Sequence, residues 1–312
     1  MATKKTVAVI GTGVIGASWA AFYLSRGFAV AAADVADGAE GRLRAWIDEY
    51  WPTLEELGLA EGASKDHLTF TASISEASCG ADFVQENGPE RLDLKRSILA
   101  EIESTAPAET IIASSSSGLL MSDAQDGMQH PGRLVLGHPF NPPHLIPLVE
   151  VLGGRQTAPE NVDAAIAFYT SIGKKPIRIN KEVPGHVANR LQAALWREMF
   201  HLVQEGVTSV ADVDTAIQYG PGLRWAIMGP FLNCEAGGGS GGITHFLEHL
   251  GPAIRDWCRD LGDYPETDDY IPTMADGVRA ELAGRDWQDV LAARDRLLLE
   301  ILAAKRTAPE IP

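Results

Sequence analysis

The sequence predicts an α/β protein in which an N-terminal doubly wound sheet, residues 1–184, is followed by an all-helical C-terminal domain, residues 185–312. Three observations support this prediction. Short apolar runs alternate with helical patterns over the first part of the chain, which is typical of a sheet covered by helices on both faces. A glycine pattern joins the first such run to the first helix. After Pro184 and Gly185, strand-like runs become scarce and helical periodicity dominates.

The first strand, helix and strand are expected at the start of the chain. Residues 5–10, KTVAVI, form a short β-branched run that is typical of a buried parallel strand. The helical pattern after this run ends at Gly27, and residues 28–33, FAVAAA, form the second run. A strand, a glycine turn, a helix and a strand within about thirty residues make a βαβ unit. Further strands are expected within residues 81–86, 110–117, 133–139, 146–153 and 175–179, and helices within 186–206 and 209–219.

The turn between the first strand and the first helix has the spacing of a dinucleotide-binding Rossmann motif. Gly11, Gly13 and Gly16 fit the pattern G-x-G-x-x-G. The first glycine of such a motif permits the tight turn, the second lets a pyrophosphate approach the backbone, and the third lets helix and strand pack closely. The amino end of the helix, which includes Val14 and Ile15, favours the pyrophosphate charge. These residues form the predicted cofactor-binding turn of a Rossmann domain.

Asp34 indicates which dinucleotide to expect. It lies eighteen positions after Gly16, at the end of the second predicted strand, where an acidic side chain accepts hydrogen bonds from the adenosine ribose. The next basic residue is Arg42. A 2′-phosphate would therefore meet a carboxylate and no neighbouring cation, so the sequence favours NAD over NADP.

Composition excludes several classes of partner. The net charge of −16 argues against nucleic acid and against anionic membrane surfaces. Cys79, Cys234 and Cys258 are far apart and form no Cys/His cluster, so neither a disulfide framework nor a zinc site is expected. No apolar run is long enough to span a membrane, and the short apolar run after Lys4 and Lys5 is not a signal peptide. We expect a cytoplasmic protein without a metal.

Bound NAD implies hydride transfer, which needs a group to take the proton of the substrate hydroxyl. No set of Cys and His ligands suggests a catalytic zinc, and no tyrosine has a lysine four positions on. The stretch GHPFNPPHLIPLVEV offers another arrangement, because its proline-rich bend can fold Glu150 back onto His138. His138 would accept the proton, and Glu150 would fix the tautomer of the imidazole and stabilise the imidazolium. His144, in the bend itself, is the competing histidine.

Five segments together resemble the L-3-hydroxyacyl-CoA dehydrogenase family: GTGVIG, ENGPERLDLK, SSSSGLL, GHPFNPPHLIPLVEV and PGHVANRL occur in the family's order and spacing. The resemblance implies a Rossmann domain joined to a helical domain that forms a homodimer. It places the catalytic histidine and glutamate on His138 and Glu150. The other implied roles are substrate and cofactor contact by Ser117, substrate binding by Asn189, support of the cofactor site by Asn141, and cofactor contact by Glu90 and Lys95. The family's usual Asn-Thr-Ser-Ser is here Ser115–Gly118, so the hydroxyl that meets the substrate stays open.

Within that family the chain resembles the branch that works without CoA, on L-carnitine or L-gulonate. Residues 40–66 hold seven acidic and three basic residues, a balance that would repel the phosphates of CoA. The expected substrate is a small 3-hydroxy acid, with L-carnitine first, L-gulonate second and an acyl-CoA as the remaining alternative. Arg224 is the candidate partner of the substrate carboxylate, and Trp225 of a trimethylammonium group. The non-enzyme alternative is an NAD-binding structural or sensor protein related to the crystallins.

Overall fold

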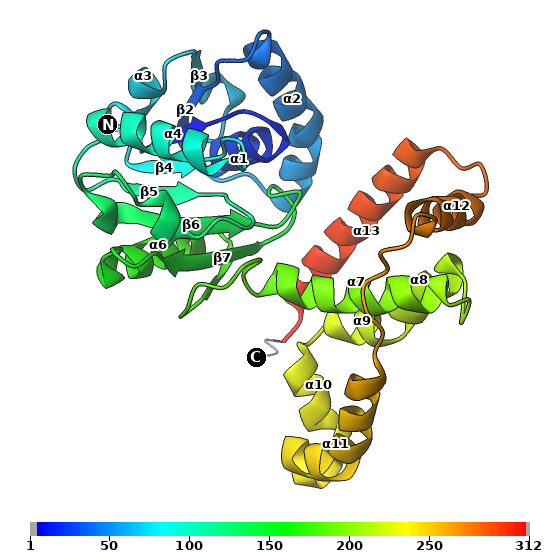
Figure 1. The fold of residues 1–312 in the computed structure, drawn as a ribbon. Coiled ribbons are helices and arrows are strands. Elements are labelled where there is room, and N and C mark those ends of the chain that lie inside the picture. The colour runs from blue at the N-terminus through cyan, green and yellow to red at the C-terminus, as the bar shows by residue number, and fades with distance from the viewer. Residues whose placement is uncertain (1–4, 310–312) are drawn as a thin grey trace. The chain divides into compact units, whose positions relative to one another are not determined.

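A computed structural model of the chain describes residues 5–309. The chain divides into two compact units after Arg190 (Figure 1). This division lies inside α7 (Ala188–Gln204), a few residues beyond the predicted boundary at Pro184. The reason is local: the backbone at the start of α7 is hydrogen-bonded to Glu150, so the first turn of the helix belongs to the first unit.

The first unit is built on one eight-stranded sheet in the order β3-β2-β1-β4-β5-β6-β7-β8. All neighbouring strands are parallel except β6 and β7, which are antiparallel. Since β2 and β4 flank β1, the strand order reverses there, and ligands of such sheets bind beyond the carboxyl ends of the strands at the reversal. The strands are β1 (Thr6–Ile10), β2 (Ala29–Ala33), β3 (Leu68–Thr71), β4 (Phe83–Glu86), β5 (Ile111–Ser114), β6 (Leu134–Pro139), β7 (Leu148–Gly153) and β8 (Lys175–Arg178).

The predicted doubly wound sheet is confirmed, with two additions. The sequence did not predict β3, a short edge strand in which Leu68 is the one buried side chain. The second addition is the direction of β7, which the sequence indicated only as a chain that folds back at the proline-rich bend. β7 runs antiparallel to β6 because a short proline-rich bend joins the two strands, whereas a parallel neighbour needs a long crossover connection.

Helices cover both faces of the sheet, and the side chains of β1 alternate between two apolar cores. Val7 and Val9 pack into one core together with α1, α2 and α6. Ala8 and Ile10 pack into the other together with α3, α4 and α5. The helices of this unit are α1 (Val14–Ser25), α2 (Ala39–Leu57), α3 (Ile74–Ser78), α4 (Leu92–Thr105), α5 (Met121–Ala124) and α6 (Pro159–Ser171).

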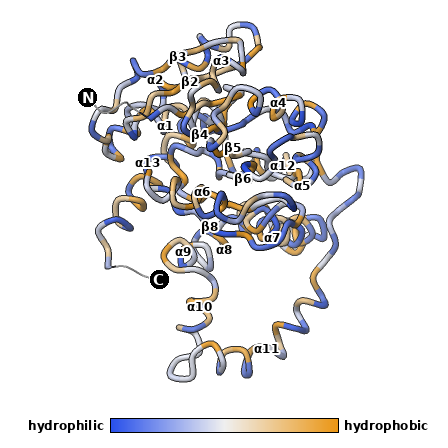
Figure 2. The backbone as a smooth tube through the Cα atoms, turned by 90° about the vertical axis from the view of Figure 1, so that its left-hand side faces the viewer, coloured by the Kyte–Doolittle hydropathy of each residue, from blue (hydrophilic) through white to orange (hydrophobic). Residues whose placement is uncertain are grey.

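Within its described residues, the second unit contains helices and connecting loops and no strand, as predicted. Its helices beyond α7 are α8 (Val210–Tyr219), α9 (Pro221–Trp225), α10 (Pro230–Gly237), α11 (Gly242–Asp260), α12 (Tyr270–Leu282) and α13 (Trp287–Thr307). Hydrophobic and hydrophilic residues alternate along α11 (Figure 2). Within residues 5–309, no helix combines the length and the apolar character needed to cross a membrane.

Three glycines shape the turn between β1 and α1, and each has a different reason to be glycine. Gly11 has a φ of +85°, and a Cβ there would lie 2.8 Å from the Asn87 carbonyl oxygen. A Cβ on Gly16 would lie 1.9 Å from the Gly11 carbonyl oxygen, so this glycine lets α1 pack against the turn. A Cβ on Gly13 would meet nothing within 4 Å. The open space beside Gly13 fits a pyrophosphate that approaches the backbone at the start of α1.

Gly13→Ala and Gly16→Ala should separate folding from cofactor binding. Gly16→Ala forces a methyl group into the Gly11 backbone, and overpacking of this kind costs roughly 1–3 kcal/mol. We therefore expect Gly16→Ala alone to lower the melting temperature of the cofactor-free protein, while both variants bind NADH more weakly. Thermal unfolding and NADH fluorescence titration measure the two effects. Equal melting temperatures for the two variants would contradict the packing role of Gly16.

Candidate active site

Two buried side chains face each other where β6 ends. The antiparallel register of β6 and β7 sets His138 directly opposite Glu150. His138 Nδ1 lies 2.9 Å from Glu150 Oε2, and the two residues are 7% and 0% exposed. An ionised carboxylate has no proton to donate, so Nδ1 carries the hydrogen of this bond. In the neutral imidazole, Nε2 then keeps a lone pair, which a proton acceptor requires.

The second carboxylate oxygen of Glu150 holds the segment that leads into α7. Oε1 accepts hydrogen bonds from the backbone N–H groups of Val187 and Ala188, each at 2.9 Å. Burial raises the pKa of Glu150, but the hydrogen bonds from His138, Ala188 and Val187 outweigh burial and leave the pKa below its usual 4.5. The carboxylate therefore stays ionised at neutral pH and joins the histidine to the chain beside Asn189.

A serine-rich turn follows β5 at the same edge of the sheet. Because β5 is parallel to β6 and Ser114 pairs with Leu136, the residues after Ser114 continue alongside His138. Asn189, at the start of α7, donates from Nδ2 to the backbone oxygen of Ser117 at 3.3 Å. The structure thus brings the predicted serine and asparagine together, next to the strand that carries the histidine.

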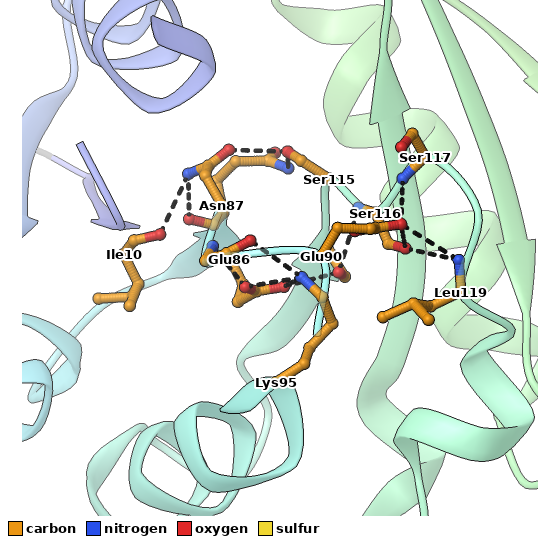
Figure 3. A network of polar contacts seen from close by, with 12 residues as sticks. Ile10, Glu86, Asn87, Glu90, Lys95, Ser115, Ser116, Ser117 and Leu119 are labelled. Atoms are coloured by element: carbon orange, nitrogen blue, oxygen red, sulfur yellow. Dashed lines mark hydrogen bonds and ion pairs between the residues drawn. The ribbon is translucent and has the colours of Figure 1, made fainter. Parts of the chain in front are cut away.

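One of the four hydroxyls in this turn has no hydrogen-bond partner in the described residues. Ser114, Ser115 and Ser116 donate to side-chain oxygens, at 2.6, 2.7 and 2.7 Å. The acceptors are, in order, Glu86, Asn87 and Glu90 (Figure 3). Ser117 is exposed, and its Oγ makes no hydrogen bond within residues 5–309. Among the hydroxyls left open by the sequence, that of Ser117 is the one available to a substrate.

The competing histidine and the predicted asparagine of the bend lie in different environments. His144 is 5% exposed, stacks on Tyr50 with ring centroids 4.2 Å apart, and its Nδ1 lies 2.8 Å from Ser18 Oγ. Ser18 also accepts the backbone N–H of His144 at 2.8 Å, so His144 anchors the bend to α1. Asn141 is exposed, and its side chain has no hydrogen bond within the described chain. Its side chain is free to meet a ligand, and its predicted support of the cofactor site stays a prediction.

Lys95 and Glu90, the two predicted cofactor contacts, are engaged within the protein. Lys95 is 1% exposed, and its Nζ donates to Glu86 Oε1 at 3.0 Å and to Oε2 at 2.8 Å (Figure 3). Breaking a buried ion pair costs roughly 3–5 kcal/mol. The Lys95 ammonium is therefore held at Glu86, and its predicted contact with the cofactor stays a prediction. Glu90 is turned toward the serine turn, where its Oε1 accepts the Ser116 hydroxyl.

Asp34 combines a predicted ligand position with a structural contact. Its Oδ2 accepts the backbone N–H of Thr12 at 2.7 Å and the Thr12 hydroxyl at 2.9 Å, and its Oδ1 accepts the N–H of Ala36 at 2.9 Å. Burial raises the pKa of Asp34, but these hydrogen bonds and the charge of Arg42 bring the pKa below its usual value. An ionised carboxylate thus stands beside the glycine turn at the end of β2, as ribose recognition requires.

His186 lies beside the dyad and was not predicted from the sequence. It is 1% exposed, its φ is +54°, and its ring centroid is 5.5 Å from that of His138. Burial lowers its pKa, and a charge on His138 lowers it further, so His186 is neutral at physiological pH. The one sequence signal was its place in PGHVANRL, directly after Gly185.

Arg224 and Trp225, the predicted partners of the two substrate ends, lie in α9 of the second unit. Trp225 is 42% exposed. The geometry of the first unit does not test their contact with substrate, and this contact stays a prediction.

Two family models match the chain in succession. Residues 6–183 match the NAD-binding domain of 3-hydroxyacyl-CoA dehydrogenase, and residues 185–267 match its C-terminal domain. The chain belongs to the 3-hydroxyacyl-CoA dehydrogenase family. The family resemblance drawn from the five sequence segments is therefore confirmed, and so is NAD as the cofactor.

Relatives match nearly the whole chain. L-carnitine dehydrogenase of Streptomyces griseus is 51% identical over 307 residues, 98% of this chain and 91% of that protein. L-carnitine dehydrogenase of Bacillus cereus is 48% identical over 300 residues, 96% and 91% of the two chains. A solved structure, the NAD+-dependent dismutase 5-formyl-3-hydroxy-2-methylpyridine 4-carboxylic acid 5-dehydrogenase, has a TM-score of 0.82 at 30% identity and covers 98% of this chain and 100% of its own. The chain with the sequence analysed above is therefore an NAD-dependent oxidoreductase that acts on a secondary alcohol.

The stabilising effect of Glu150 should depend on pH. Because its pKa is lowered in the folded protein, its contribution is fully present above the unfolded value of about 4.5 and is lost as the pH falls through the folded value. We expect wild type to be more stable than Glu150→Gln at pH 6, with the difference shrinking below pH ~4.5. Urea unfolding of both proteins between pH 3.5 and pH 6 measures the difference. A constant difference across this range would show that Glu150 is not an ionised anchor.

Proposed function

We propose that this chain oxidises the C3 hydroxyl of L-carnitine to 3-dehydrocarnitine with NAD as the hydride acceptor. The chemical step rests on one observation, the buried His138–Glu150 pair with its lone pair on Nε2. The choice of substrate rests on the relatives named L-carnitine dehydrogenase, which are 44–51% identical over 96–98% of the chain. The intact set of histidine, glutamate, serine and asparagine favours an enzyme over an NAD-binding structural protein.

The reaction transfers a proton to the protein and a hydride to the cofactor, and different residues serve the two transfers. Ser117 Oγ and Asn189 Nδ2 hydrogen-bond the substrate oxygen. His138 Nε2 takes the hydroxyl proton as the C3–O bond becomes a carbonyl, and Glu150 stabilises the imidazolium that results. Bound NAD supplies the acceptor for the hydride that leaves C3. Asp34 holds the adenosine ribose, while Gly11, Gly13, Val14, Ile15 and Gly16 hold the pyrophosphate.

The surface around α2 supports a substrate without CoA. Residues 40–66 contain three basic side chains, Arg42, Arg44 and Lys65, and each of them already has an acceptor in the protein. Their acceptors are the Asp37 carbonyl, Glu40 and Asp48, in that order. The same segment carries seven carboxylates, so the phosphates of a CoA tail would meet net repulsion. A small zwitterion such as carnitine avoids this surface.

We assign the far ends of the substrate and the dimer contact to the second unit. Arg224 would bind the carboxylate with two parallel hydrogen bonds, and the face of Trp225 would receive the trimethylammonium group. The many exposed apolar side chains of this unit support a homodimer, because exposed apolar surface that is contiguous marks a contact surface. The most exposed of them are Phe231 at 80%, Tyr219 at 78% and Ile271 at 72%.

Replacing the histidine should remove turnover without removing the cofactor. His138→Ala lacks the proton acceptor, so we expect kcat to fall by roughly 10²–10⁴. The dissociation constant for NADH, measured by fluorescence titration, should stay unchanged. His144→Ala is the matched control and should retain most of the turnover. If His138→Ala turned over normally, the mechanism would fail.

A substrate screen tests the proposed function directly. We expect NAD reduction to be fastest with L-carnitine among L-carnitine, L-gulonate, L-3-hydroxybutyrate and 3-hydroxybutyryl-CoA, and NADP to be a poor substitute for NAD. D-carnitine is the control for the configuration at C3. Turnover of gulonate or of the acyl-CoA with none of carnitine would overturn the proposed substrate.

A further inference from the structure

One oxygen of Glu90 collects four hydrogen bonds from the serine turn. Oε1 accepts the Ser116 hydroxyl at 2.7 Å and the backbone N–H groups of Ser117, Gly118 and Leu119 at 3.0, 2.8 and 3.2 Å (Figure 3). The Ser116 hydroxyl also accepts the Leu119 N–H at 3.0 Å. Three successive backbone N–H groups that converge on one point form an anion-binding nest. Here the protein fills its own nest with a carboxylate from the segment between β4 and α4.

The negative charge is what makes this arrangement strong. Hydrogen bonds to an ionised acceptor are about twice as strong as those between neutral groups. Burial raises the pKa of Glu90, but the bonds from Ser116 and Gly118 and the charge of Lys95 lower it below the usual value. The carboxylate is therefore ionised at neutral pH. The buried Lys95–Glu86 pair joins the two ends of the segment that carries Glu90.

The nest fixes the backbone of the residue whose hydroxyl is available to the substrate. The N–H of Ser117 is bound by Glu90, and its carbonyl oxygen accepts the Asn189 amide at 3.3 Å. Both peptide groups of Ser117 are thus held while its Oγ has no partner in the described chain. Glu150 likewise holds the backbone of the residues that precede Asn189, since it accepts the N–H groups of Val187 and Ala188. Two carboxylates therefore hold the two segments that carry the substrate hydrogen-bonding groups.

We propose that Glu90 is a positioning residue for Ser117 and that Glu90 Oε1 acts on the reaction through the serine turn, apart from any contact that the other carboxylate oxygen makes with the cofactor. This inference rests on the proposed roles of Ser117 and His138 and deepens them. If the turn were less rigid, the Ser117 hydroxyl would hydrogen-bond the reacting substrate oxygen less often, and the chemical step would be slower. The pyrophosphate and adenosine-ribose contacts lie at β1, α1 and β2, so the affinity for NADH distinguishes the positioning role from a cofactor contact of Glu90.

Glu90→Gln and Glu103→Gln form a matched pair for the test. Glu103 also accepts two successive backbone N–H groups, those of Gln129 and His130, but it does so ahead of β6, away from the serine turn. Glutamine keeps the size of the side chain and removes the charge. We expect Glu90→Gln to lower kcat roughly 10- to 100-fold, by the scale of lost charge-assisted hydrogen bonds. The loss of kcat should exceed any loss of NADH affinity, and Glu103→Gln should leave kcat unchanged.

Hydrogen exchange gives a readout that does not depend on the substrate. Amides of residues 117–119 should exchange faster in Glu90→Gln than in wild type, and amides of residues 129–130 faster in Glu103→Gln. Unchanged exchange at 117–119 would overturn the positioning role. So would normal kcat combined with weakened NADH binding, which would make Glu90 a cofactor contact. Failure of the wild type to oxidise L-carnitine would instead refute the proposed function and leave the exchange result intact.

Discussion

The ionised, fully buried carboxylate of Glu150 is the constraint on which the site depends. One oxygen orients the His138 ring and the other binds the backbone at the start of α7. A buried charge is tolerated only where hydrogen bonds satisfy it, and here they come from both the catalytic strand and the segment that precedes Asn189. The histidine and the glutamate are therefore joined by hydrogen bonds to the backbone that leads to the asparagine. These hydrogen bonds also explain why the first compact unit includes the first turn of α7.

The cofactor side of the site rests on backbone geometry rather than on buried charge. Gly16 lets α1 approach the turn, and Gly13 leaves space where a pyrophosphate would lie. Asp34 stabilises that turn through Thr12, so the carboxylate proposed to hold the ribose also holds the loop beside it. Cofactor binding and folding share these residues, whereas the proton-transfer pair lies on β6 and β7. The two halves of the reaction thus depend on separate parts of one sheet.

The sequence predicted the features that local pattern encodes. Alternating apolar runs indicated the sheet, glycine spacing indicated the nucleotide turn, and the proline-rich bend suggested that Glu150 returns to His138. Contacts that depend on which strands are neighbours could not be predicted. Lys95 has the sequence context of an exposed helix residue, yet it is buried because α4 places it over Glu86 at the end of β4. Likewise, the distinct partners of the serines after β5 depend on the adjacency of β4 and β5, which no periodicity encodes.

Because β6 and β7 pair antiparallel, a change in chain length has a different effect in the strands than in the bend that joins them. Side chains alternate between faces along a strand, so losing one residue of β7 would turn Glu150 to the opposite face and set a valine across from His138. The bend between Pro139 and Leu148 has no such alternation to keep, and the entropy of loop closure changes slowly with its length, but His144 binds it to Ser18 of α1. Insertions and deletions within this hairpin are therefore confined to its tip. A change of length there keeps the register of the proton-transfer pair, provided that His144 still reaches Ser18.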